Sequence, residues 1–175
     1  FLLSGAFAQA ENTATESVME STVVPMKASG KRATRKDIQK QWQALVNQTL
    51  PLATAQLSKA SSFYPFAAVQ MTDGQVKIIS AQDNQATLSP ASALVLLRKE
   101  IASLAATGRL QAVVYFADAV VTRKDTGLRQ TGIRLKLDHA SGDAMEGFVP
   151  YQKDAKGNLT MLTPEYRPST NATFQ

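Results

Sequence analysis

Acidic side chains that could perform general acid–base chemistry stand on the longest β-patterned stretch of the chain, residues 110–151. Asp118, Asp138 and Glu146 fall on strands that we expect to be neighbours, and facing side chains of paired strands lie within a few ångströms of each other. Glycoside hydrolysis uses such a pair in a cleft, with the pKa of one acid raised by burial. Asp118 is the leading candidate, because strict alternation puts it on the same face as Phe116.

An ordinary ion pair explains this acid more simply. Arg134 and Lys136 alternate with apolar residues on the next expected strand, so either could neutralise a partly buried Asp118. We favour this structural interpretation over catalysis.

His139 is the only histidine, and imidazole is the side chain best suited to act as a base near neutral pH. A serine nucleophile would have to use it, but Ser141 lies two residues away in a predicted turn, where we expect the two side chains not to face each other reliably. The chain has no cysteine and no G-x-S-x-G motif. We therefore interpret His139 as a surface or hydrogen-bonded turn residue.

Basic residues on the middle strand could alternatively hold an anion. Arg134 and Lys136 point away from the apolar face of that strand, with Lys124 and Arg129 nearby, although solvated strand charges are the simpler explanation. A groove between the sheet and a helix expected over residues 89–108 is another candidate. The predicted ligand or partner surface consists of Arg134 and Lys136 on the sheet face and of Tyr64, Phe66 and Tyr151 in the groove.

Composition removes several classes of chemistry. The absence of cysteine excludes disulfides, thiolate catalysis and cysteine metal sites, and a single histidine excludes multi-histidine sites. Phosphate-binding loops, dinucleotide fingerprints and calcium loops have no match in the sequence. We therefore expect neither a cofactor nor a metal.

The net charge of +5 comes from one short segment. Its basic residues are Lys27, Lys31, Arg32, Arg35 and Lys36, with no acid among them, so the charges of the remaining chain sum to zero. Nucleic-acid modules usually carry their basic surface on the folded part, so this distribution argues against nucleic acid. A solvated linker is the favoured interpretation, and attraction to anionic envelope polymers is the alternative.

The ends of the chain suggest export and a single domain. Residues 1–10 are apolar and finish in Ala8-Gln9-Ala10, the small-residue pattern that a signal peptidase cleaves, so we interpret them as the C-terminal part of a signal peptide. This predicts a periplasmic or secreted protein. We expect a flexible tether over 11–33, one domain over 34–165 and an irregular tail over 166–175. No stretch approaches the twenty apolar residues of a membrane-spanning helix.

Local signals predict two helical regions. Thr34 and Asp37 have the spacing of a capping box, and an apolar stripe follows at helical spacing, but Pro51 should kink or break this helix before a second segment over 52–59. Ser89-Pro90 should start the second helix and Gly108 should end it.

Strand signals surround these helices. Asp73-Gly74 joins two apolar runs into a hairpin over 63–80. Three further strands form a meander from Leu110 to Tyr151, with turns at 123–127 and 140–143, and a short strand is expected over 159–163. This order indicates an α+β fold, a five-stranded antiparallel sheet with the helices packed on one face.

The order of hairpin, helix and meander over residues 63–153 resembles the roadblock, profilin and PAS-type architectures, which place the hairpin beside the last meander strand. A curved sheet of the cystatin or nuclear-transport-factor kind is the competing fold. Tyr64-Pro65-Phe66-Ala67, Asp73-Gly74, Asp138-His139 with Gly142, and Pro150-Tyr151 also resemble phrases in small uncharacterised bacterial exported proteins. This second resemblance implies no activity.

These observations favour an exported, non-enzymatic binding or interaction module for an unknown protein or small ligand. An exposed sheet edge would permit a homodimer by strand pairing. The first alternative is an envelope-directed hydrolase that uses Asp118, Glu146 or His139. The second is a structural or assembly factor whose basic tether touches anionic polymers.

Overall fold

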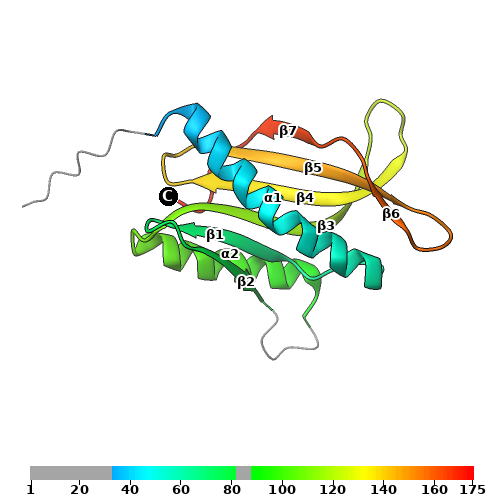
Figure 1. Ribbon diagram of the computed structural model, residues 1–175, viewed down its shortest axis with the longest axis horizontal. Helices are drawn as coiled ribbons and strands as arrows, with labels where there is room; N and C mark the ends of the chain where they lie inside the picture. Colours follow the sequence, from blue (N-terminus) through cyan, green and yellow to red (C-terminus); the bar gives the residue numbers. More distant parts are fainter. Residues whose placement is uncertain (1–32, 82–87) are drawn as a thin grey trace, which may run out of the picture. The chain divides into compact units, whose positions relative to one another are not determined.

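A seven-stranded antiparallel sheet forms the centre of the fold (Figure 1). The computed structural model describes residues 33–81 and 88–175. The elements are α1 (Arg35–Lys59), β1 (Phe66–Met71), β2 (Val76–Ser80), α2 (Pro90–Ala106), β3 (Leu110–Thr122), β4 (Arg129–His139), β5 (Ala144–Lys153), β6 (Leu159–Met161) and β7 (Glu165–Pro168). The predicted signal-peptide remnant, and all of the predicted tether except Ala33, lie outside the described residues.

The strand order is β2-β1-β3-β4-β5-β6, and β7 pairs with β5. The hairpin therefore lies beside the first strand of the meander, through pairs such as Phe66 with Phe116, and not beside the last strand as the profilin-type resemblance implies. The sequence of β1 and of the first half of β3 is apolar at nearly every position. Such runs suit strands that are covered on both faces and paired on both edges.

The two helices lie on opposite faces of the sheet, so the prediction that both pack on one face is wrong. Phe66 and Ala68 of β1 belong to the core beneath α1, whereas Ala67 and Val69 belong to the core beneath α2. Successive side chains of a strand point to opposite faces, and β1 is apolar at both parities. A strand of this kind needs cover on each side.

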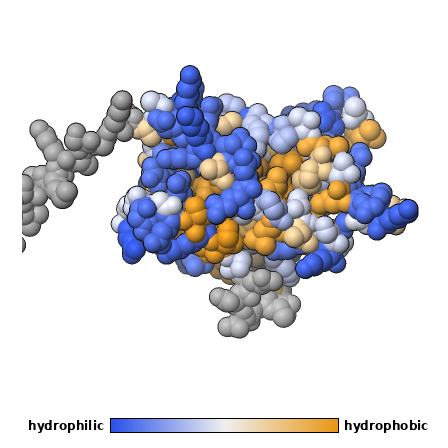
Figure 2. Space-filling view, viewed as in Figure 1, coloured by the Kyte–Doolittle hydropathy of each residue, from blue (hydrophilic) through white to orange (hydrophobic). Residues whose placement is uncertain are grey.

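Helix α1 begins with the predicted capping box. Thr34 Oγ1 accepts a hydrogen bond from the Asp37 amide at 3.2 Å, and Asp37 Oδ2 accepts one from the Thr34 amide at 2.9 Å. The helix continues through Pro51, so the expected break is wrong. Ala53 and Leu57 are fully buried beyond that proline, and their packing on the sheet offsets the lost backbone hydrogen bond. In Figure 2 the outward surface of α1 is mostly hydrophilic.

Helix α2 begins and ends where the sequence predicts. Ser89 Oγ accepts the Ser92 amide at 3.1 Å, Pro90 occupies the first helical position, and Gly108 follows the helix with a φ of +70°. No helix in the described ranges combines the length and the apolar character that crossing a membrane requires.

The C-terminal part is more ordered than the sequence predicts. The expected strand near 159–163 is present as β6, but the first residues of the expected irregular tail belong to β7, in which Arg167 pairs with Glu146 of β5. Pro168 is the last residue of β7, where its missing amide donor interrupts no ladder. Residues 169–175 then turn back across the end of the sheet, with the Ser169 amide donating to the Ala144 carbonyl at 3.1 Å.

Candidate functional site

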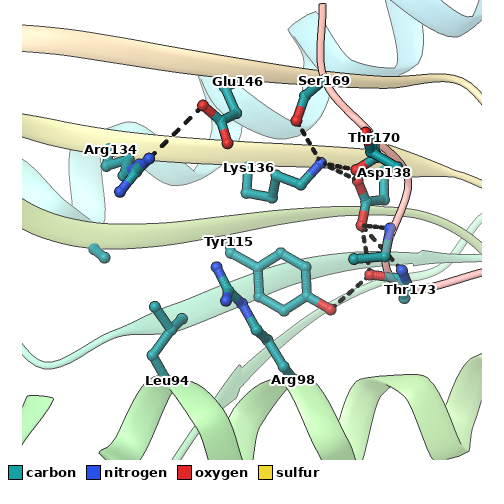
Figure 3. A pocket seen from close by; sticks show the side chains of 12 residues that line it. Leu94, Arg98, Tyr115, Arg134, Lys136, Asp138, Glu146, Ser169, Thr170 and Thr173 are labelled. Atoms are coloured by element: carbon teal, nitrogen blue, oxygen red, sulfur yellow. Dashed lines mark hydrogen bonds and ion pairs between the residues drawn. The ribbon is translucent and has the colours of Figure 1, made fainter. Parts of the chain in front are cut away.

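A hollow of about 500 Å³ lies on the face of the sheet that carries α2. The core beneath α2 draws on β1 and β3, and the hollow lies next to it, over β3, β4 and β5. Helix α2, the three strands and the C-terminal segment all contribute to its walls (Figure 3). Its charged and aromatic lining residues, together with one buried threonine, are Arg98, Tyr115, Arg134, Lys136, Asp138, Glu146 and Thr173.

Asp138 forms the base of this hollow and is fully buried. Its Oδ2 accepts hydrogen bonds from the Thr173 hydroxyl at 2.7 Å, the Thr173 amide at 3.2 Å and the Ala172 amide at 3.2 Å. Its Oδ1 lies 2.8 Å from Lys136 Nζ. That contact is an ion pair without directed hydrogen-bond geometry, because Oδ1 accepts no hydrogen bond among the described residues. A buried carboxylate requires such compensation.

Lys136 is largely committed to the structure. Its Nζ donates to the Ser169 hydroxyl at 3.1 Å and to the Thr170 carbonyl at 2.6 Å, in addition to its contact with Asp138. An ammonium group has three donors, and only 14% of this side chain is exposed. Lys136 therefore fixes the C-terminal segment and is less available to a ligand than the sequence suggests.

Tyr115 extends the same network. Its hydroxyl lies 2.9 Å from Thr173 Oγ1, and burial raises the pKa of Tyr115 to about 12. The phenol is therefore neutral across the physiological range. The guanidinium carbon of Arg98 lies 5.9 Å from the centre of the Tyr115 ring, a cation–π arrangement that holds the arginine beside the hollow.

Two arginines from different elements reach the mouth of the hollow. Figure 3 shows Arg98 rising from α2 beside Tyr115, while Arg134 comes from β4 near Glu146. Glu146 lies 2.7 Å from a nitrogen of Arg167 but 3.7 Å from Arg134, and the closer guanidinium is the main cause of its lowered pKa. Arg134 is 57% exposed. Within residues 33–81 and 88–175, Arg98 has no ion pair, so the mouth keeps a positive surplus.

The structure separates Asp118 from the other two acids considered for catalysis, Asp138 and Glu146, which both line the hollow but are paired with Lys136 and Arg167. Asp118 lies on the α1 face with Phe116, as alternation predicts, whereas Glu146 faces Lys136 on the α2 face. The expected ion pair of Asp118 is wrong for the same reason, since Arg134 and Lys136 point to the other side of the sheet.

The partner of Asp118 is an aromatic hydroxyl. Tyr151 Oη donates to Asp118 Oδ1 at 3.0 Å. Burial raises the pKa of Asp118 above its usual value, and the hydrogen bond from Tyr151 partly opposes this shift. With Glu146 on the far face, the described structure gives Asp118 no second carboxylate for the two-acid chemistry considered above.

His139 is buried beneath α1 and does not lie at the surface. Contrary to our expectation, Ser141 faces it, with Oγ 2.8 Å from Nδ1, while His139 Nε2 lies 2.8 Å from Gln41 Oε1. Asp143 accepts the Ser141 hydroxyl at 2.7 Å and therefore contacts the serine, not the histidine. A catalytic triad has the base between the acid and the nucleophile, an order that this chain of contacts does not follow.

The predicted aromatic groove is not formed. Phe66 is 2% exposed and Tyr151 7% exposed in the core beneath α1, and the Phe66 ring stacks on Phe116 with centroids 5.0 Å apart. Tyr64 is exposed and donates to the Leu88 carbonyl at 3.1 Å. Since α2 covers the opposite face, Phe66 and Tyr151 line no groove with it.

The sequence did not single out Arg98 or the segment 169–173 as parts of a site. Arg98 stands four residues after Leu94, at the border of the apolar stripe of α2, a weak signal that a long side chain reaches the sheet. No local pattern predicts that the C-terminal segment forms part of a site. Its residues Ser169, Thr170 and Thr173 are ordinary polar residues after a proline.

Comparisons with family models, with curated proteins and with solved structures found no match to this chain. In the part of the chain that the structure describes, no three histidine or acidic side chains gather in a way that could hold a metal ion.

Proposed function

We propose that this protein is a binding module that holds an anionic ligand, bearing a carboxylate or a phosphate, in the hollow beside α2, and that it acts in the periplasm or outside the cell. One observation supports the anion-binding role. Two arginines, Arg98 and Arg134, converge on a hollow whose acids have closer partners: Asp138 is paired with Lys136, and Glu146 lies nearer to Arg167 than to Arg134. The proposed location in the periplasm or outside the cell is supported only by the signal-like residues 1–10.

The chemistry of the walls suits this ligand class. A guanidinium presents planar donors that match a carboxylate or phosphate in a bidentate way, and Arg98 and Arg134 approach from different elements. The base offers neutral groups, because Asp138 is compensated by Lys136 and Tyr115 is protonated. The volume of about 500 Å³ falls in the range of small-ligand pockets.

The direct test is an NMR titration of the full chain with glutarate and, separately, with inorganic phosphate. We expect saturable shifts of amides around the hollow and of the Arg98 and Arg134 Nε–Hε signals. Arg98→Ala should weaken binding by about tenfold or more, the loss expected for a charge-assisted contact. Lys156→Ala, an exposed lysine in the β5–β6 turn, is the matched control and should leave binding unchanged.

The proposal fails if neither anion shifts these signals at concentrations up to about 10 mM, well above the range of useful affinity. It also fails if Lys156→Ala weakens binding as much as Arg98→Ala, because attraction would then be diffuse.

The location is tested separately by mass spectrometry of the protein from the exported fraction of its own host. A chain that begins at Glu11 supports export, whereas retention of residues 1–10 contradicts it. Homodimer formation through β2, the last strand on one side of the sheet, and the role of the basic tether stay predictions.

A further inference from the structure

A second hollow of about 500 Å³ adjoins the first one on the sheet. The two share Arg134 and Glu146 as lining residues, so they meet at this pair. The second hollow continues toward the β3–β4 turn and β7, where Lys124, Phe148 and Arg167 line it. The site described above is thus one end of a longer depression.

The acids along this depression are all paired. Asp138 pairs with Lys136, Glu146 with Arg167, and both Asp125 and Glu165 with Arg123. The remaining cations are Arg98, Arg134 and Lys124. Among the described residues Arg98 and Lys124 form no ion pair, and Arg134 has only its 3.7 Å contact to Glu146.

These three cations are spread along the depression. Arg98 borders the first hollow, Arg134 stands where the hollows meet, and Lys124 borders the second. Along β3, Tyr115 lines the first hollow and Val121 the second, six residues apart on the same face. At about 3.3 Å per residue this separation is about 20 Å, the length of about six residues of extended peptide.

Apolar surface lies between the cations. Leu94 and Ala117 line the first hollow and Phe148 the second. The Phe148 ring packs against Gly132, where an added Cβ would be 2.4 Å from Cζ, so this glycine makes room for the ring on the sheet. A ligand that matches this surface carries apolar groups between its acidic groups. Peptides have such side chains, whereas nucleic acids and acidic polysaccharides do not.

We propose that the two hollows form one site for an extended acidic peptide of about six residues, in which the side chains that face the sheet, at every second position, are acidic and apolar in turn. This inference rests on the proposed anion-binding function and deepens it by naming the ligand class. Recognition of acidic segments by separated basic side chains is a known mode of peptide binding.

The test uses fluorescence anisotropy with three labelled, end-blocked probes and the full chain. The first is a hexapeptide with glutamate at its first and fifth positions, leucine at its third and serine at the others. The second is a glutamyl-serine dipeptide, and the third is the hexapeptide with glutamine in place of glutamate. We expect the acidic hexapeptide to bind at least about tenfold tighter than either other probe, since a second charged contact is worth about one decade or more.

Charge-reversal variants locate the contacts. Arg98→Glu should weaken both acidic probes, whereas Lys124→Glu should weaken the hexapeptide by about tenfold and leave the dipeptide unchanged. Lys156→Glu, at an exposed lysine that lines neither hollow, is the control and should change neither affinity. Thermal unfolding of each variant verifies that the fold is intact.

The outcomes separate the two proposals. If the hexapeptide binds no tighter than the dipeptide, or if Lys124→Glu has no effect, the extended site is wrong while the anion site stands. If an oligonucleotide or an acidic oligosaccharide of similar length binds as tightly as the peptide, the ligand class is wrong. If no acidic probe binds and glutarate and phosphate also fail, the anion-binding function itself is wrong.

Discussion

Thr173 donates its hydroxyl hydrogen to Asp138 Oδ2 at 2.7 Å, across 35 residues of sequence. This contact closes the C-terminal segment over the base of the hollow. The same hydroxyl lies 2.9 Å from the Tyr115 hydroxyl, so a single side chain connects β3, β4 and the end of the chain.

Thr173→Val should destabilise the fold. Valine keeps the shape of the side chain but removes the shortest donor to the buried Asp138 carboxylate. It also leaves the buried Tyr115 hydroxyl without its Thr173 partner, and an unsatisfied buried group costs about 1–3 kcal/mol. The free energy of unfolding is measured by urea titration. Thr170→Val removes a hydroxyl from an exposed neighbour and should stay within about 0.5 kcal/mol of the parent. Equal losses in both variants would refute this role of Thr173.

Lys136→Met should destabilise the fold more strongly. The buried carboxylate of Asp138 would lose its counter-ion, and removing one partner of a buried ion pair costs about 3–5 kcal/mol. The free energy of unfolding is measured by urea titration, with a second lysine substitution as the control. Lys153 does not suit this purpose, because its Nζ donates a hydrogen bond to the Ala60 carbonyl. Lys156→Met is therefore the control. A double variant with Asp138→Leu should recover part of the loss, and an additive loss would contradict the pairing.

His139 should make stability depend on pH below neutrality. Burial lowers the pKa of His139 below its ordinary value of 6.5, with Asp143 opposing the shift, so the unfolded chain binds the proton more readily than the folded one. The free energy of unfolding should thus be fully maintained above pH 6.5 and should fall as the pH drops through the folded pKa. Urea titrations at a series of pH values from above 6.5 downward measure this fall in the free energy of unfolding.

His139→Gln is the variant that assigns this dependence. Glutamine does not titrate, and the chain has no other histidine. The slope just below pH 6.5 should therefore disappear in the variant. If the free energy of unfolding of the variant keeps the same slope against pH, another titratable group causes the dependence.

Pro51→Ala should stabilise the protein. Proline inside α1 leaves a helical carbonyl without its amide donor, and its side chain is exposed, so alanine restores a hydrogen bond without loss of core packing. Helix-interior proline costs about 3 kcal/mol relative to alanine in model helices, an upper limit here because α1 already accommodates the ring. A higher Tm is expected. An unchanged or lower Tm would show that the proline is fully accommodated.

Local sequence signals determined the secondary structure well. The capping box of Thr34, the Asp73-Gly74 turn and the Ser89-Pro90 helix start all stand where predicted, because each depends on backbone conformations and hydrogen bonds within a few residues. Alternation also placed Asp118 on the face of Phe116 correctly.

The site was predicted only in part. Arg134, which the sequence suggested only as part of an exposed sheet face, lines the hollow, whereas Lys136 is bound to the C-terminal segment and Arg98 was not anticipated. His139 was interpreted as a surface or hydrogen-bonded turn residue. The structure gives it the hydrogen bonds but buries it at the end of β4, because α1 packs over it, which the local sequence does not reveal.

The sequence by itself determined the helices, most of the strands and the two faces of each strand. Tertiary structure alone decided which helix covers which face, that β3 pairs with β1, and that Thr173 reaches Asp138. The physical reason is the distance along the chain over which each interaction acts. Capping, turns and alternation are fixed by neighbouring residues, whereas an apolar face accepts any complementary apolar surface and a buried carboxylate accepts any donor that the folded chain brings to it.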